Sequence, residues 1–170
     1  ERFLPFYEKN ISLFSSKDSH YRARGEFKIW HDGDEIFYAM NNIEKNGVIL
    51  VDECPQVNET IFALMPKLME KLRVQEIGFK LFGVDFLSSS HGEVVVSLLY
   101  HRKLDAFWQE KATKIAVELK IHIIGRSRNQ KVVIGQDFVT EKLKIKDEEF
   151  SFKHIENSFT QPNSSVNEKM

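Results

Sequence analysis

Histidine and cysteine are the side chains that most readily bind metals or act as nucleophiles, and their spacing here favours neither role. The six histidines form no H-x-x-x-H, H-E-x-x-H or Cys–His pattern of the kind that zinc sites use. Cys54 is the only cysteine, which excludes an internal disulfide and a multi-cysteine metal site. It has no lysine or histidine within four residues, so we interpret it as a passive thiol. G-x-G-x-x-G, P-loop and G-x-S-x-G motifs are also absent, and the sequence contains no complete catalytic constellation.

Cations and aromatic residues alternate in the segment Tyr21–Trp30. In a strand, the two-residue period places four charged side chains on one face: Arg22, Arg24, Glu26 and Lys28. Cations on a sheet face can bind nucleic-acid phosphates. The alternative is a solvated face on which Glu26 pairs with an arginine.

Two further basic segments could contact nucleic acid. His101 ends an apolar strand and precedes Arg102 and Lys103, where it could stack on a base or donate to a phosphate, or simply end a strand before a charged turn. The segment Gly125–Lys131 reads as a basic loop in which backbone N–H groups near Gly125, together with Arg126 and Arg128, could hold a phosphate. A plain hairpin loop is the alternative.

Two phenylalanines, Phe82 and Phe86, fall on one face of a predicted strand over 79–87. Either could belong to the core. Either could instead be a stacking platform, which is worth roughly 1–3 kcal/mol per base.

Hydrophobic periodicity predicts two helices and a larger number of short strands. A helix over 58–73 has an apolar stripe, and Pro66 inside it predicts a kink or a break. Asp105 is the predicted N-cap of a second helix that ends near Leu119. The predicted strands span 21–31, 35–40, 48–51, 79–87, 93–101, 121–124, 131–134, 143–145 and 149–155. We therefore expect an α+β fold, a mostly antiparallel β-sheet with both main helices on one face.

Composition places the chain among soluble globular proteins of one domain. It has 170 residues, and no apolar run approaches the roughly 20 residues needed to span a bilayer. A single cysteine favours a reducing, cytoplasmic setting. The net charge of -1 argues against a uniformly basic nucleic-acid binder but allows a local basic face.

Both ends of the chain suggest neighbouring structure. Phe3, Leu4 and Phe6 come before any predicted element, and the segment 1–19 is treated as a lead segment. Asn163 can cap a helix after Pro162, but no apolar stripe follows it. We expect a further domain to begin over 157–170.

Four strings of residues resemble the bacterial tRNA uracil-5-methyltransferases, which form 5-methyluridine at position 54 of the T-loop. They are His20–Asp34, Val95–Asp105 with Trp108, Ile124–Arg126, and Glu156–Asn163. The resemblance covers the chain from about His20 to its end. It implies an RNA-binding domain over 20–156, followed by a Rossmann-like domain that binds S-adenosylmethionine and begins within 157–170.

The family's chemistry, as the resemblance implies it, is covalent. A cysteine thiolate adds to C6 of the uracil, C5 takes the methyl group from S-adenosylmethionine, and a carboxylate removes the C5 proton before the cysteine leaves. The family's cysteine and base match no position in this chain, and Cys54 does not match the nucleophile's motif. We therefore expect no catalytic residue here and an inactive fragment.

The resemblance also assigns binding roles to individual residues. Gln161 would lie against the methionine end of the cofactor, Phe82 would stack on a base of the tRNA T-arm, and His101 would contact the same loop. Lys28 stands where the family usually has arginine, so the charge is kept and the bidentate fork is lost. Arg22 and Arg24 match the family and could contact phosphates or form internal ion pairs.

Two alternative functions stay open at this point. In one, the domain is a structural module that packs against the catalytic half and leaves recognition to it. In the other, the target uridine is in ribosomal RNA. Families of that second kind commonly carry a four-cysteine iron–sulfur motif, which one cysteine cannot build.

Overall fold

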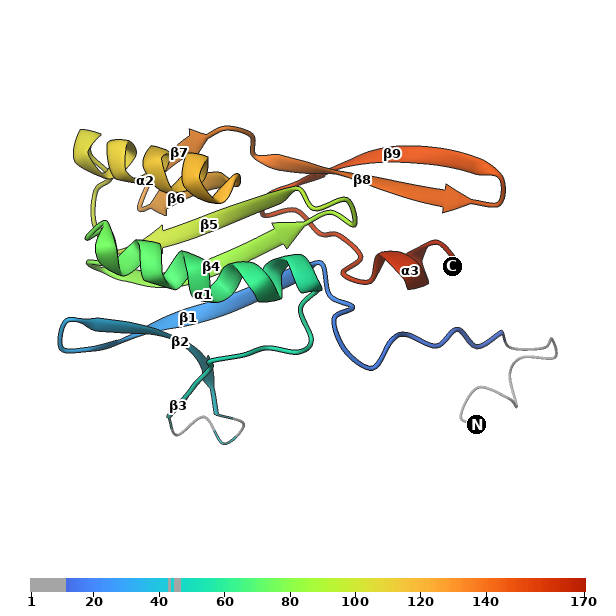
Figure 1. The fold of residues 1–170 in the computed structure, drawn as a ribbon, viewed down its shortest axis with the longest axis horizontal. Helices are drawn as coiled ribbons and strands as arrows, with labels where there is room; N and C mark the ends of the chain where they lie inside the picture. The colour runs from blue at the N-terminus through green and yellow to red at the C-terminus, as the bar shows by residue number, and fades with distance from the viewer. Residues whose placement is uncertain (1–11, 43, 45–46) are drawn as a thin grey trace.

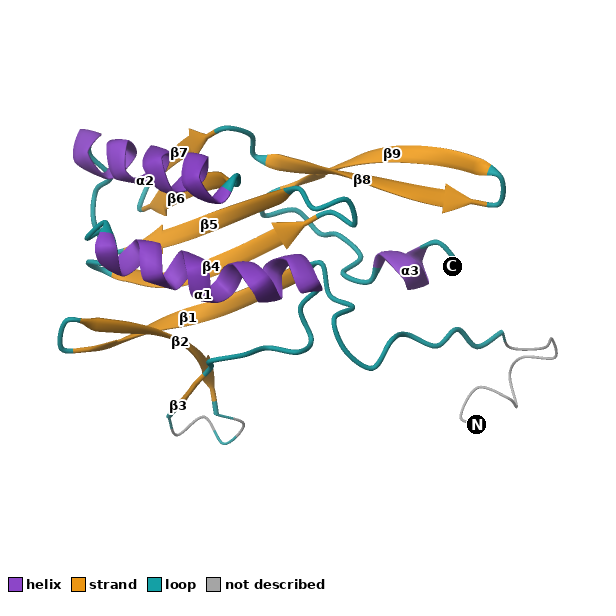
Figure 2. Cartoon of the chain, in the orientation of Figure 1, coloured by secondary structure: helices purple, strands orange, loops and turns teal. Residues whose placement is uncertain are grey.

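The computed structural model describes residues 12–42, 44 and 47–170. A seven-stranded sheet runs in the order β3-β2-β1-β4-β5-β6-β7, and a two-stranded hairpin, β8-β9, projects from its edge (Figures 1 and 2). The strands are β1 Arg24–Asp32, β2 Glu35–Asn41, β3 Val48–Leu50, β4 Leu81–Ser88, β5 Val94–Tyr100, β6 His122–Ser127, β7 Gln130–Ile134, β8 Phe138–Ile145 and β9 Glu148–Ile155. The helices are α1 Glu59–Val74, α2 Ala106–Leu119 and α3 Ser164–Asn167.

The α+β fold with a mostly antiparallel sheet is confirmed, with one exception in the pairing. Strands β5 and β6 are parallel, and every other pair in the sheet is antiparallel. Helix α2 supplies the crossover that parallel neighbours need. The apolar residues Phe3, Leu4 and Phe6 lie outside the described residues.

Helix α1 begins at a side-chain cap and buries an apolar stripe. The Asn58 side chain accepts a hydrogen bond from the backbone N–H of Ile61, which satisfies a donor of the first turn. Leu68 and Leu72 are fully buried against the sheet. Pro66 lies inside the helix without dividing it, so the predicted break is wrong. The packed stripe outweighs the loss of one helical hydrogen bond.

Helix α2 is fixed by its cap and by one large side chain. Asp105 accepts from the backbone N–H of Trp108, as the sequence predicts for an N-cap. Trp108 is fully buried and meets Tyr100 of β5 edge-to-face, with ring centroids 5.8 Å apart. A Cβ atom added at Gly125 of β6 would lie 2.3 Å from the Trp108 ring, so only glycine allows this packing.

Helices α1 and α2 lie over one face of the sheet (Figure 1). The other face is covered in part by the hairpin. Strand β8 brings Val139 against Leu87, Val95 and Ile124, which form a small second core at one end of that face. We call the remainder, on the side opposite α1 and α2, the open face. It contains the residues that alternate with the core positions along the strands.

A buried carboxylate ties the hairpin to the segments beside it. Glu141 of β8 is fully buried and accepts hydrogen bonds from the Ser90 backbone N–H and hydroxyl, and from the Ser164 hydroxyl at the start of α3. Asn163 caps α3 through the Val166 N–H, as predicted. No helix within the described ranges is long and apolar enough to cross a bilayer.

Candidate nucleic-acid interface

Two stacked rings occupy the open face where β4 and β5 pair. The Phe82 and His101 rings lie 4.0 Å apart between centroids with an interplanar angle of 15°. Phe82 is 40% exposed, and its neighbour His101 is also exposed. A flat, solvent-facing aromatic pair of this kind can extend its stack onto a nucleic-acid base.

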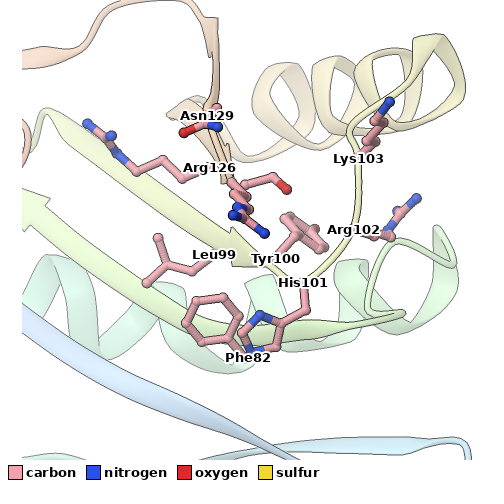
Figure 3. Close-up of a pocket in the computed structure, with 10 residues that line it drawn as sticks. Phe82, Leu99, Tyr100, His101, Arg102, Lys103, Arg126 and Asn129 are labelled. Carbon is pink, nitrogen blue, oxygen red and sulfur yellow. The ribbon is translucent and has the colours of Figure 1, made fainter.

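The stacked pair borders a surface pocket of about 580 Å³ that we call the His101 pocket (Figure 3). Its wall includes Leu99 and cationic residues from two segments, the turn after β5 and the end of β6 with the β6–β7 turn. The cations that line it are Arg102, Lys103, Arg126 and Arg128. The sequence assigned these two basic segments separate roles, and the fold places them around one cavity.

A break in strand register explains why Phe82 is on the surface. The β4–β5 pairing shifts between Leu81 and Gly83, so alternation restarts there and Phe82 turns away from the core. The prediction that Phe82 and Phe86 share a face is therefore wrong. Phe86 is 1% exposed and packs against Phe27 in the core, with centroids 6.0 Å apart.

A second cavity, of about 660 Å³, adjoins the first along Phe82 and Leu99. We call it the Asp85 pocket. Small residues, Ala39 and Gly83, lie on either side of Lys28 in the strand register and leave room above the sheet. A cavity of this size is large enough for a nucleoside.

The two cations of β1, Arg24 and Lys28, interact with neighbouring side chains or carbonyls. Arg24 forms an ion pair with Glu26 at 3.0 Å and donates to the Ser158 carbonyl at 2.9 Å, which is the paired arrangement that the sequence left open. The Lys28 ammonium donates to the Asn41 side-chain oxygen at 2.6 Å. Arg22 is exposed beside Arg24, so both Arg22 and Lys28 remain accessible to a phosphate.

Arg126 has a stronger partner than the sequence suggested. Its guanidinium donates to both carboxylate oxygens of Glu156, at 2.7 and 2.6 Å, and the Ser97 hydroxyl donates to the same carboxylate at 2.8 Å. Burial raises the pKa of Glu156, but the hydrogen bonds from Arg126 and Ser97 outweigh it and hold the pKa below its usual range. Arg126 therefore fixes the wall of the His101 pocket.

The prediction of a basic loop over 125–131 is wrong in its bounds. Gly125 and Arg126 lie inside β6, where Gly125 pairs with Val132, and its close approach to Trp108 accounts for the glycine. Only Arg128 and Asn129 form the turn, with Asn129 at a positive φ of 59°. Arg128 is thus exposed at the rim of the His101 pocket.

Asp85 was not singled out from the sequence. It lies in the middle of the sheet on the open face, between Glu26 of β1 and Ser97 of β5. Burial, and then the nearby Glu26 carboxylate, raise the pKa of Asp85 to about 6. A single aspartate in a mostly apolar strand is a weak signal that such a residue faces a cavity.

Gln161, the predicted cofactor contact, lies in the loop between β9 and α3. The Pro162 carbonyl next to it accepts from the Ala23 N–H at 2.7 Å, which anchors the loop, while the Gln161 side chain is exposed. One exposed amide cannot enclose a cofactor, so the described residues do not by themselves form an S-adenosylmethionine site. Within the same described ranges, no group of three or more metal-ligating side chains is found.

Comparison with known proteins identifies relatives along the whole chain. The chain is 64% identical to a tRNA/tmRNA (uracil-C(5))-methyltransferase of Sulfurimonas denitrificans, covering 100% of this chain and 46% of the relative. It is 44% identical to the protein of that name in Acinetobacter baylyi, covering 99% of this chain and 48% of the relative. The chain thus spans about half the length of the curated relatives it matches.

A solved structure shares the fold. The crystal structure of Pyrococcus abyssi tRNA (uracil-54, C5)-methyltransferase, in complex with S-adenosyl-L-homocysteine, aligns with a TM-score of 0.64 at 18% identity. The alignment covers 99% of this chain and 42% of that one. The family model described as tRNA (Uracil-5-)-methyltransferase matches residues 1–170. This chain therefore belongs to the tRNA (uracil-5-)-methyltransferase family.

Proposed function

We propose that residues 20–156 form the tRNA-binding part of a cytoplasmic tRNA uracil-5-methyltransferase that acts on uridine 54 of the T-loop. The observation that carries the proposal is the exposed Phe82–His101 stack between two cavities on the open face. Such a platform suits the unpaired bases of a loop, which can leave their own stack and lie on an aromatic surface. The family membership supplies the substrate class.

The residues of this chain would bind and position the RNA. Phe82 and His101 offer a stacking surface, while Arg128, Arg102 and Lys103 lie where they can neutralise phosphates on either side of it. Arg22, just before β1, and Lys28 within β1 would add two further exposed cations. A target uridine must leave the loop stack before its C5 and C6 atoms can react.

Residues 157–170 would begin the domain that holds S-adenosylmethionine, with Gln161 as one of its contacts. The cofactor would supply the methyl group. Gln161 has one acceptor and two donors on its amide, which suit the carboxylate and ammonium groups of a methionine moiety. None of the reacting groups for the uracil is assigned to this chain.

A structural role is the second candidate, and one observation favours it. Phe150 and Phe152 of β9 are 39% and 43% exposed and lie on the same side of the hairpin as the buried Leu143. An exposed apolar strip of this kind is typical of a protein–protein contact. In this case the domain would pack against the catalytic half and contribute little to RNA selectivity.

The test is fluorescence anisotropy of this chain against a labelled T-arm hairpin and a hairpin with a scrambled loop. Phe82→Ala should weaken T-arm binding by about 1–3 kcal/mol, because it removes one stacking surface. Phe107→Ala is the matched control, since Phe107 is 47% exposed but lies on α2. Equal loss in both variants, or equal binding to both hairpins, would favour the structural role.

A further inference from the structure

We propose that the Asp85 pocket is a second nucleobase site, distinct from the Phe82–His101 stack, and that it takes an unpaired guanine whose Watson–Crick edge donates to the Asp85 carboxylate. The proposal rests on the proposed RNA-binding function and deepens it by naming a base. It comes from a juxtaposition on the open face: an aromatic wall, a small-residue floor and one carboxylate that has no hydrogen-bond or ion-pair partner among the described residues.

The position of the carboxylate is unusual for a surface that binds a polyanion. Within the described ranges, Asp85 makes no hydrogen bond or ion pair, although it lies in the middle of a sheet and is half-buried. Its neighbours are already engaged, Glu26 by Arg24 and Ser97 by Glu156. A desolvated carboxylate without donors is costly, and a ligand that brings its own donors would relieve that cost.

The chemistry of the cavity selects among the bases. A carboxylate only accepts hydrogen bonds, and guanine has two adjacent donors, N1–H and N2–H, on one edge. Adenine and cytosine place an acceptor beside their amino group, and uracil has a single donor between two carbonyls, so each would set an acceptor against Asp85. Lys28, which lines the same cavity, has further ammonium protons for the guanine O6 atom.

The shape of the cavity agrees with a flat ring. Ala39 and Gly83 flank Lys28 in the register and leave space above the sheet, and the Lys28 side chain is drawn aside toward Asn41. A Cβ atom at Gly83 would lie 3.0 Å from Leu99, so a larger residue would crowd this floor. Phe82 and Leu99 separate this cavity from the His101 pocket, which lets two bases of one loop occupy neighbouring sites.

The experiment measures the affinity of this chain for T-arm hairpins in which each unpaired guanine is replaced in turn by inosine. Inosine lacks only the exocyclic amino group, so one replacement should lower the affinity of the unaltered chain about tenfold. Asp85→Asn should lower the affinity for the unmodified hairpin about 10- to 100-fold and abolish the guanine-to-inosine difference. Circular dichroism would verify that the variant is folded.

Glu110→Gln is the matched control, because it removes one negative charge from the exposed surface of α2 and leaves Asp85 and its cavity in place. It should keep the guanine-to-inosine ratio unchanged. If Asp85→Asn also keeps that ratio, or binds the hairpin more tightly as simple charge removal would predict, the guanine site is refuted. Loss of binding in Phe82→Ala alongside an unaffected Asp85→Asn would refute only this inference. Absence of selective T-arm binding by the unaltered chain would refute both it and the proposed function.

Discussion

The two faces of the seven-stranded sheet are built from the same strands and differ in almost every property. The face under α1 and α2 is apolar and closed, with Phe27 and Phe86 of the sheet and Trp108 of α2 each 4% exposed or less. The open face alternates charged, aromatic and small residues and holds two cavities. The closed face therefore supplies most of the packing that stabilises the fold, which leaves the residue types on the open face free to serve binding.

The largest expected effect is on the closed face. Trp108→Ala should lower the free energy of unfolding by about 3–5 kcal/mol, because it leaves a large cavity between α2 and β6. Trp30→Ala is the control on the open face, where Trp30 is 47% exposed, and should change it by less than about 1 kcal/mol. Urea denaturation of both variants tests the contrast, and equal losses would contradict it.

An effect of intermediate size is expected for the Arg126–Glu156 ion pair, which joins β6 to the end of the hairpin. Glu156→Gln should lower the free energy of unfolding by about 1–3 kcal/mol, because the buried Glu156 side chain loses its charge-assisted hydrogen bonds with the half-buried Arg126. Glu149→Gln removes an exposed partner of Lys142 and should lower it by less than about 0.5 kcal/mol. Thermal melts would distinguish the two variants. A negligible change in the melting temperature of Glu156→Gln would mean that the ion pair does not stabilise the fold.

Asp85 predicts a pH dependence of the opposite sign to that of a salt-bridged carboxylate. Its pKa is raised to about 6 in the folded state, so its ionised form opposes folding at neutral pH. Protonation of Asp85 should therefore raise the free energy of unfolding by about 1–2 kcal/mol as the pH falls from above 6 toward 4, after allowance for the partial exposure of its side chain.

The groups that face Asp85 set this window. Glu26 and Glu156 raise its pKa, and Arg24 and Arg126 lower it. Glu156 affects stability at lower pH than Asp85. Its pKa is lowered in the folded state, so the stability that its ionised form contributes is lost only as the pH falls through the acidic range. Asp85→Asn should remove the rise between about pH 6 and 4 in urea denaturation. A rise that persists in this variant would assign it to another group.

The smallest expected effect concerns a single rim cation. Arg128→Ala should weaken T-arm binding modestly and reduce the slope of log affinity against log salt by about 1, because one phosphate contact is lost. Lys114→Ala on α2 removes an exposed cation from the helix side and should leave the slope unchanged. Equal slopes in both variants would mean that the cations of the His101 pocket do not contact the RNA.

The sequence predicted the elements well and their pairing less well. Periodicity located α1, α2 and most of the strands, because apolar spacing is a local property. It predicted only 143–145 of β8, which begins at Phe138. The register shift at Phe82 and the parallel β5–β6 pair depend on contacts between distant segments, so no local pattern revealed them. The prediction that Gly125 marks a loop is wrong. A glycine is needed there because the Trp108 ring of α2 packs against it, and local sequence does not show that contact.

The candidate site shows the same division. The Phe82 and His101 assignments came from resemblance and stay predictions of function, but the structure brings the two rings into contact. The Arg126–Glu156 ion pair joins residues 30 positions apart, which spacing in the sequence cannot connect. The position of Asp85 beside a cavity likewise depends on the neighbouring strands and is not visible in the sequence.

The most direct test of the difference between the faces is a nuclear magnetic resonance titration of the isotope-labelled chain with a T-arm hairpin. Amide signals of Phe82, Leu99 and His101 on the open face should shift, while those of the exposed surfaces of α1 and α2 should not. Shifts concentrated on the helices, or on the Phe150–Phe152 strip alone, would contradict it.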